Sequence, residues 1–198
     1  MNLVDVQSNG GIHAPTIRYH KGTFYIITTN VYNSGDGSPG LMRNFIITAK
    51  DPLGPWSDPH IIDGANGIDP DIFFDDDGKV YFTGTHNPGD INSNGIGAIW
   101  IQELDVKKWK LIGEKYSIMD DRLGKHTEGP HIYKENGTYY LLIAVGGTGK
   151  EHAVMIAASK DIFGPYEENH RNPILTSRHW SHDYFVNNVG HADMIELE

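Results

Sequence analysis

The chain has 198 residues, and its net charge of −10 argues against nucleic acid or an anionic membrane surface as a partner. It contains no cysteine, which excludes disulfides and thiolate metal sites. The first ten residues have no basic region and no apolar stretch, and no window approaches 18 apolar residues. We therefore expect no signal peptide, no membrane span and a cytoplasmic protein, unless a preceding segment carries an export signal.

One short phrase recurs along the chain. Three copies contain Pro15, Pro70 and Pro130, and a fourth opens at Gly190. A period of 55 to 60 residues between the prolines is typical of an array of supersecondary units. Each copy carries a polar residue at its head, where we expect the chemistry to lie, namely His13, Asp69, Glu128 and His191.

Each of the first three copies is predicted to form a β-hairpin. The hairpins run over residues 16–29, 71–84 and 131–144, with Gly-containing turns between runs of aromatic and β-branched residues. The acidic run 75–77 in the second turn is interpreted as solvated, because it lacks the spacing of a calcium loop.

A third strand is predicted after each hairpin, and a fourth follows around an aromatic residue. The third strands are expected at 44–49, 99–104 and 153–158, and the fourth near Trp56, Trp109 and Tyr166. Four strands in a unit of this size form a β-propeller blade. A β-sandwich is the alternative, but sandwich strands do not need matched proline and glycine residues at constant separation.

We therefore predict an all-β fold in one domain, residues 1–198. Its blades are expected at approximately 11–64, 65–125 and 126–187, and residues 188–198 start the next. This makes about three and a half four-stranded blades, whereas a propeller needs at least four and hides its sheet edges by closing its ring. The chain is thus expected to be an incomplete propeller, with open blade edges available for self-association or for a complementing chain.

The innermost strands of a propeller line its central channel, so the heads of the repeats are expected to meet at one end of that channel. Carboxylates brought together there from different blades can differ strongly in pKa. Glycoside hydrolysis requires such a pair, because one carboxylic acid protonates the leaving oxygen while a carboxylate handles water.

The motifs at the heads of the repeats resemble those of glycoside hydrolase family 43, the five-bladed β-xylosidases and α-L-arabinofuranosidases. The resemblance covers nearly the whole chain in the right order, and its motifs are at 10–19, 67–79, 128–133, 146–154 and 190–193. It implies a glycosidase that hydrolyses O-glycosyl bonds of xylosides or arabinosides, such as oligosaccharides from xylan and arabinan, by an inverting acid/base mechanism.

The resemblance also implies roles for three residues. Glu128 matches the general acid, and Asp69 matches the carboxylate that raises the pKa of that acid and orients it. His191 matches a channel histidine near a cation, often Ca²⁺, or near water. Because Ca²⁺ prefers oxygen ligands, His191 is expected to act through water, and the chemistry itself requires no cofactor. Each residue also has a structural alternative: Glu128 as a hairpin-edge carboxylate, Asp69 as a turn aspartate and His191 as a core histidine.

Three further residues are candidates for contact with a sugar. His13 stands where the family often has an aromatic residue, Phe45 could pack on the substrate or in the core, and His152 could lie at the pocket rim. The sequence does not distinguish xylose from arabinose, and part of that choice is expected in loops 33–43 and 85–97.

One departure from the family pattern affects the expected activity. The family's general base is an aspartate in an Asp-Pro motif of the first blade, and Asp5 is not followed by proline. A late sugar-contacting arginine of the family also has no match. Three alternatives stay open, namely a non-catalytic carbohydrate-binding propeller fragment, a self-associating structural fragment and a fructan-cleaving five-bladed relative, whose motifs fit less well.

Overall fold

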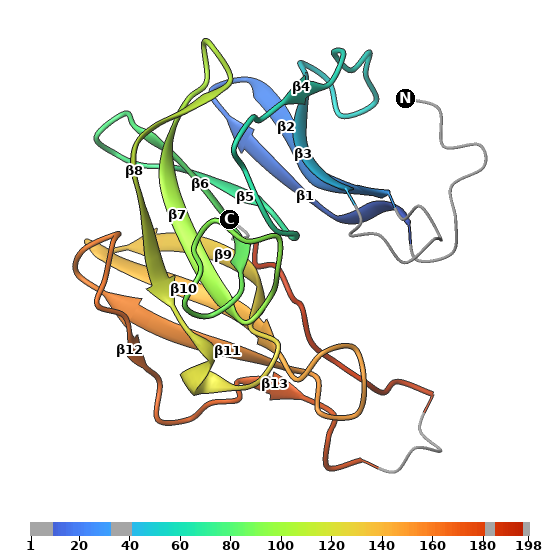
Figure 1. Cartoon of the computed structure of the whole chain (residues 1–198), viewed down its shortest axis with the longest axis vertical. Coiled ribbons are helices and arrows are strands. Elements are labelled where there is room, and N and C mark those ends of the chain that lie inside the picture. Colours follow the sequence, from blue (N-terminus) through green and yellow to red (C-terminus); the bar gives the residue numbers. More distant parts are fainter. Residues whose placement is uncertain (1–9, 33–40, 181–184, 196–198) are drawn as a thin grey trace.

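The computed structural model of the chain describes residues 10–32, 41–180 and 185–195. In these ranges the chain forms three antiparallel sheets (Figure 1). The first contains β1 (Gly11–His20), β2 (Thr23–Tyr32), β3 (Leu41–Ala49) and β4 (His60–Ile61). The second contains β5 (Asp71–Phe74), β6 (Val80–His86), β7 (Ala98–Asp105) and β8 (Lys110–Met119). The third contains β9 (Glu128–Glu135), β10 (Thr138–Val145), β11 (Ala153–Ser159) and β12 (Glu167–Glu168), with β13 (Leu175–Thr176) also paired to β11.

The three predicted hairpins are confirmed, because β1–β2, β5–β6 and β9–β10 are antiparallel pairs. Two of their turns place consecutive residues at positive φ, Lys21 and Gly22 at 47° and 77°, and Asn136 and Gly137 at 49° and 70°. Such turns match the twist of the strands that they join. The third strands β3, β7 and β11 are also confirmed. The fourth strands differ in length. The strand β8 after Trp109 is long, whereas β4 after Trp56 and β12 after Tyr166 have two residues each.

The sheets pack on one another through two apolar clusters. One joins the first and second sheets and includes Ile27, Ile46, Phe82 and Trp100. The other joins the second and third sheets and includes Ile99, Ile101, Leu141 and Ile143. The first strands β1, β5 and β9 are neighbours, so one inner strand of each sheet faces the same region. The prediction of an all-β fold with propeller-like sheets is confirmed.

The acidic turn of the second hairpin differs from the prediction that it is solvated. Asp75 is buried, and its carboxylate accepts hydrogen bonds from Lys134 Nζ at 2.5 Å and from Tyr139 Oη at 2.7 Å. The prediction was wrong for this residue because both partners come from the third sheet, about 60 residues later in the chain.

Residues 185–195 contain no assigned strand, although 188–198 was expected to begin another blade. Figure 1 shows this segment in red, ending between the sheets. Its Asp193 bonds to Arg18 of β1 and to Tyr133 of β9. Side chains of the inner strands therefore hold the segment where a further inner strand was expected.

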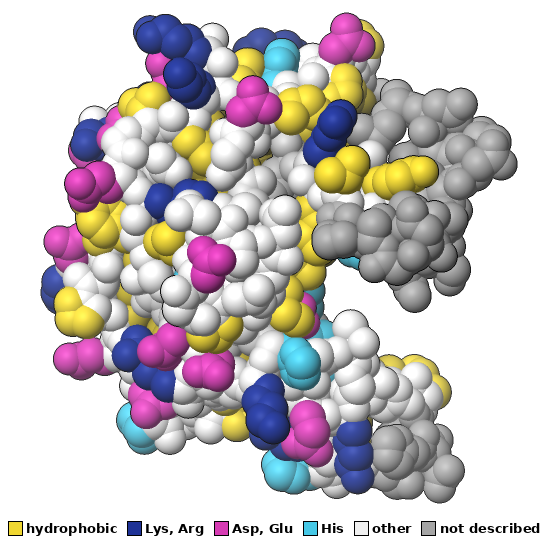
Figure 2. Space-filling view, viewed as in Figure 1, with side chains coloured by type: hydrophobic (Ala, Val, Ile, Leu, Met, Phe, Trp, Pro, Cys, Tyr) yellow, Lys and Arg dark blue, Asp and Glu magenta, His cyan; other side chains and the backbone are white. Residues whose placement is uncertain are grey.

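The visible surface carries charges of both signs. In Figure 2, Lys and Arg side chains are interspersed with Asp and Glu on the face shown. Within the described ranges, no helix has the length and apolar character needed to cross a membrane.

Candidate active site

All four copies of the repeat share a backbone feature. Ala14, Asp69, Gly129 and His191 have φ between 40° and 58°, in the left-handed region. The first three of these residues directly precede the repeat prolines, and His191 occupies the same place before Ala192. Left-handed backbone is uncommon for residues other than glycine and is costly at Asp69 and His191, which is typical of functional sites. The chain thus turns sharply at the head of each inner strand.

Polar side chains from neighbouring segments hold the loop that presents Asp69. Asn44 is buried in β3, and its Nδ2 donates to the carbonyls of Ala65 at 3.0 Å and Gly67 at 3.1 Å. The Ile68 amide donates to Thr85 Oγ1 at 2.9 Å. Gly67 has φ 79°, and a Cβ there would lie 2.0 Å from the Thr85 carbonyl oxygen, so the loop needs glycine at this position.

Glu128 begins β9 and is 9% exposed. Burial, followed by the negative charge of Asp69, raises the pKa of Glu128 to about 7. The pairing of β9 with β10 shifts register between Glu128 and His131. These two residues are three positions apart on β9, but their partners on β10 are only two positions apart. Such a bulge re-aims side chains and here brings Glu128 to the same side of the strand as His131. Glu128 can thus hold or release a proton near neutral pH.

Asp69 lies close to this acid and is 6% exposed. Burial raises the pKa of Asp69, and this effect is opposed by His191, by a hydrogen bond from the Gly129 amide, and by His13. The bond from Gly129 links Asp69 directly to the residue after Glu128. The structure therefore brings Asp69, Glu128, His13 and His191 together at the heads of their segments.

The His191 ring packs directly on the Gly129 backbone. A Cβ at Gly129 would lie 2.6 Å from the ring, so glycine is required both by this contact and by its φ of 58°. Burial lowers the pKa of His191 while the charge of Asp69 opposes that change. The described residues contain no group of three or more His, Asp or Glu side chains that could hold a metal ion. The groups that act on His191 are two carboxylates, Asp69 and Asp193, and two imidazoles, His131 and His152. A cation near His191, bound directly or through water, stays a prediction.

The other predicted sugar contacts lie in different surroundings. His152 is buried, its Nδ1 is 2.9 Å from the Asn188 carbonyl oxygen, and its Nε2 has no partner within the described ranges. Phe45 is 5% exposed and follows Asn44 on β3. Because successive side chains of a strand point to opposite faces, Phe45 points away from the Asp69 loop that Asn44 contacts. In the described part of the chain, no ring contact joins Phe45 to the other candidates. Its role on a sugar stays a prediction.

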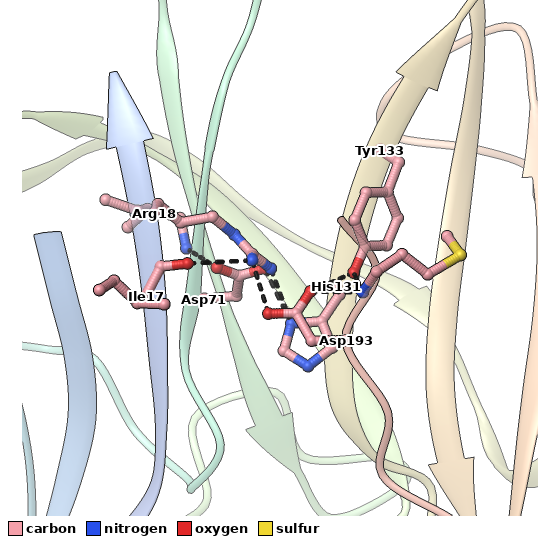
Figure 3. Close-up of polar contacts among 8 residues, drawn as sticks. Ile17, Arg18, Asp71, His131, Tyr133 and Asp193 are labelled. Carbon is pink, nitrogen blue, oxygen red and sulfur yellow. Dashed lines mark hydrogen bonds and ion pairs between the residues drawn. The ribbon is translucent and has the colours of Figure 1, made fainter. Parts of the chain in front are cut away.

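Sequence reasoning missed a second group of polar residues, directly after the heads (Figure 3). Arg18 of β1 bonds through Nη2 to Asp71 at 2.5 Å and through Nη1 to Asp193 at 2.6 Å. His131 Nδ1 is 3.0 Å from both Asp71 Oδ2 and Arg18 Nη2. The sequence carries a signal for this group, because the residue after each repeat proline or its equivalent is polar, namely Thr16, Asp71, His131 and Asp193.

Comparison with known proteins identifies relatives of this arrangement. The model of glycosyl hydrolases family 43 matches residues 2–198. A protein from Butyrivibrio fibrisolvens named xylosidase/arabinosidase is 51% identical over 191 residues, covering 94% of this chain and 35% of the relative. A Vibrio protein named xylan 1,3-beta-xylosidase is 37% identical and covers 100% of this chain and 37% of its own length.

A solved structure has the same arrangement of strands. The crystal structure of xylan beta-1,4-xylosidase from Bacillus halodurans C-125 superposes with a TM-score of 0.87 at 36% identity, over 98% of this chain and 37% of that one. The chain thus spans about a third of the length of these relatives. By its sequence match and its fold, the chain belongs to glycosyl hydrolases family 43.

Proposed function

We propose that this chain carries the acid half of a glycosidase site that hydrolyses xylosides or arabinosides with inversion. The observation that carries the proposal is Glu128, whose pKa is raised to about 7 in a buried position next to Asp69. An acid with this pKa is protonated over much of the neutral range and can still release its proton. General acids are most effective when their pKa lies near the working pH.

Glu128 is the general acid in this proposal and gives its proton to the glycosidic oxygen as the bond to the sugar breaks. Asp69 stays close to it, raises the pKa of Glu128 by its negative charge and accepts the Gly129 amide hydrogen bond. The bond aligns the Asp69 carboxylate with the turn that carries Glu128. No cofactor is needed for this proton transfer.

Inversion also requires a carboxylate that activates water on the opposite face of the sugar. Asp71 and Asp193, two further carboxylates near the heads of the inner strands, are each engaged in an ion pair with Arg18. We propose that the water-activating aspartate comes from outside the described residues. The relatives named xylosidase and arabinosidase support the choice of pentose glycosides as substrates.

The pairing of Asp71 and Asp193 with Arg18 also favours a second candidate function, namely sugar binding without turnover. In this case the site at Glu128 and Asp69 recognises a pentose, and no hydrolysis follows. This candidate predicts measurable affinity for xylose or arabinose even where the best aryl glycosides are not cleaved.

The test is hydrolysis of aryl β-D-xylosides and aryl α-L-arabinofuranosides, together with calorimetric binding of D-xylose and L-arabinose. Glu128→Gln is compared with Glu135→Gln, an exposed glutamate at the other end of the same strand. We expect Glu128→Gln to lower turnover about 10²–10⁴-fold, with the smallest loss for the best leaving groups, because these need least protonation.

The controls separate the outcomes. Glu135→Gln is expected to leave turnover unchanged. Binding without turnover in the wild-type chain, weakened by Glu128→Gln, would favour the second candidate over the first, because the first predicts turnover wherever a water-activating aspartate is supplied. Equal behaviour of Glu128→Gln and Glu135→Gln in both assays would refute both functions.

A further inference from the structure

The segment that carries His191 is held by side chains on both sides of this histidine. Residues 188–194 belong to no strand, so the ladder of hydrogen bonds that fixes β1, β5 and β9 does not fix them. His191 nevertheless lies against Gly129, the neighbour of Glu128. The contacts on each side of His191 explain how a segment without strand structure holds this ring in place.

On the C-terminal side, the anchor is the Asp193 carboxylate. Its Oδ2 accepts from Arg18 Nη1 at 2.6 Å, and its Oδ1 accepts from the Tyr133 hydroxyl (Figure 3). The Tyr133 oxygen in turn accepts from the Met194 amide at 2.9 Å. Burial alone would raise the pKa of Asp193, but the hydrogen bonds from Arg18 and Tyr133 lower it, so the carboxylate is ionised when docked.

On the N-terminal side, the anchor is His152, which directly precedes β11 of the third sheet. Its Nδ1–H donates to the Asn188 carbonyl at 2.9 Å, and a Cβ at Gly190 would lie 2.3 Å from the ring. The Val189 amide donates to Ser177 Oγ at 3.1 Å. These contacts fix the backbone two and three residues before His191.

Arg18 is itself firmly placed by the other sheets. Its Nη2 contacts Asp71 of β5 and His131 of β9, and its guanidinium carbon lies 5.8 Å from the centre of the Tyr133 ring. A guanidinium presents five donors in a rigid fork, so one side chain can bind two carboxylates at once. The fork thus links three sheets to the segment 188–194.

We propose that Arg18 and Tyr133 are positioning residues that dock the Asp193 carboxylate and thereby hold the His191 ring on Gly129, beside Glu128. The proposal rests on the proposed function only in counting His191 as part of the site. Arg18 and Tyr133 act through Asp193 and are not expected to touch a substrate. The sequence motif Gly-His-Ala-Asp at 190–193 then carries both the site histidine and its docking group.

The test compares Asp193→Ala and Tyr133→Phe with the wild-type chain by NMR. Two readouts are followed, the ring signals of His191 and the hydrogen exchange of the Met194 amide. We expect the His191 signals to move toward those of an unstructured histidine and the Met194 exchange to accelerate about tenfold or more, because each variant removes a partner of the anchor.

His60 provides an internal reference, since its ring stacks on Trp109 at 4.4 Å, on other elements of the molecule. Its signals are expected to stay unchanged. The matched control is Asp120→Ala, which removes an exposed carboxylate 3.5 Å from Arg122 and should change neither readout.

Unchanged His191 signals and Met194 exchange in both variants would overturn the proposal, as would an equal change at His60. If Asp193→Ala does not fold, Tyr133→Phe decides, because it removes a single hydroxyl. Both readouts are taken without a sugar, so a chain that fails to hydrolyse glycosides can still meet or fail this test.

Discussion

The sheets of this protein are joined in two different ways, one apolar and one polar. Between the sheets, aliphatic and aromatic side chains such as Phe82, Trp100 and Leu141 are fully buried. At the inner strands, Arg18, Asp71 and His131 meet through directional bonds instead. Apolar contacts are non-directional, so they fix how sheets stack but not where one atom lies. The polar contacts fix individual side chains, which a catalytic acid requires.

The largest expected effect is therefore on stability, from the apolar interface. Phe82 is 0% exposed and stacks on Trp100 with ring centres 5.5 Å apart. We expect Phe82→Ala to lower the free energy of unfolding by about 4 kcal/mol, measured by urea denaturation, because it leaves a cavity. Leu53→Ala is the control, since this side chain is 94% exposed and should change stability by less than about 0.5 kcal/mol. Similar values for the two variants would contradict the apolar half of the comparison.

The second-largest loss of stability is expected from the polar group at the inner strands. Asp71→Ala leaves the guanidinium of Arg18 without its most buried partner, and we expect a loss of about 3 kcal/mol in the free energy of unfolding. Arg18 still pairs with Asp193 in this variant. Adding Arg18→Met should therefore cost further stability, but less than Arg18→Met costs in the wild-type chain, because the Arg18–Asp71 pair is already lost. The two residues would not be coupled if Arg18→Met lowered the free energy of unfolding as much in the Asp71→Ala protein as it does in the wild-type chain.

Asn44→Ala is expected to have an intermediate effect. It leaves the carbonyls of Ala65 and Gly67 without their donor, and it removes the acceptor for Thr29 Oγ1 at 2.6 Å. We expect a loss of about 2 kcal/mol in unfolding free energy. Because these bonds hold the Asp69 loop, turnover of aryl glycosides should also fall while the Glu135→Gln control stays unaffected. Full activity in a destabilised Asn44→Ala protein would show that the loop places Asp69 without this asparagine.

Local signals in the sequence predicted the strands. The sequence did not predict the features that depend on contacts between sheets. The Lys21-Gly22 and Asn136-Gly137 turns were predictable because neighbouring residues specify them. Asp75 was interpreted wrongly because its partners Lys134 and Tyr139 belong to another sheet. In the site, Asp69 and Glu128 stood out by their motifs, but they are not at equivalent positions, since Asp69 is one residue before its proline and Glu128 is two before Pro130.

The smallest expected effect concerns the pKa of Glu128 and separates its two causes. Burial is the first cause and the charge of Asp69 the second, so Asp69→Asn should lower this pKa by about 1 and leave it above 4.5. Asp63→Asn, at an exposed residue of the same loop, is the control and should leave the pKa unchanged. A drop to 4.5 in Asp69→Asn would show that burial contributes nothing.

The same pKa sets the pH dependence of activity and stability. In the proposed function hydrolysis needs protonated Glu128, so the rate should fall as the pH rises through about 7. Between pH 4.5 and about 7 the folded chain retains a proton that the unfolded chain releases, so stability should fall with rising pH across this window. Glu128→Gln lacks this proton and should lose less stability over the same window, as measured by urea denaturation at each pH.

The most direct measurement is a ¹³C NMR titration of the Glu128 carboxyl in the wild-type chain, assigned by comparison with Glu128→Gln. We predict a midpoint near 7, because the carboxyl is buried beside Asp69 at the heads of the inner strands. A midpoint near the ordinary value of 4.5 would contradict the assignment of Glu128 as an acid that is protonated near neutral pH.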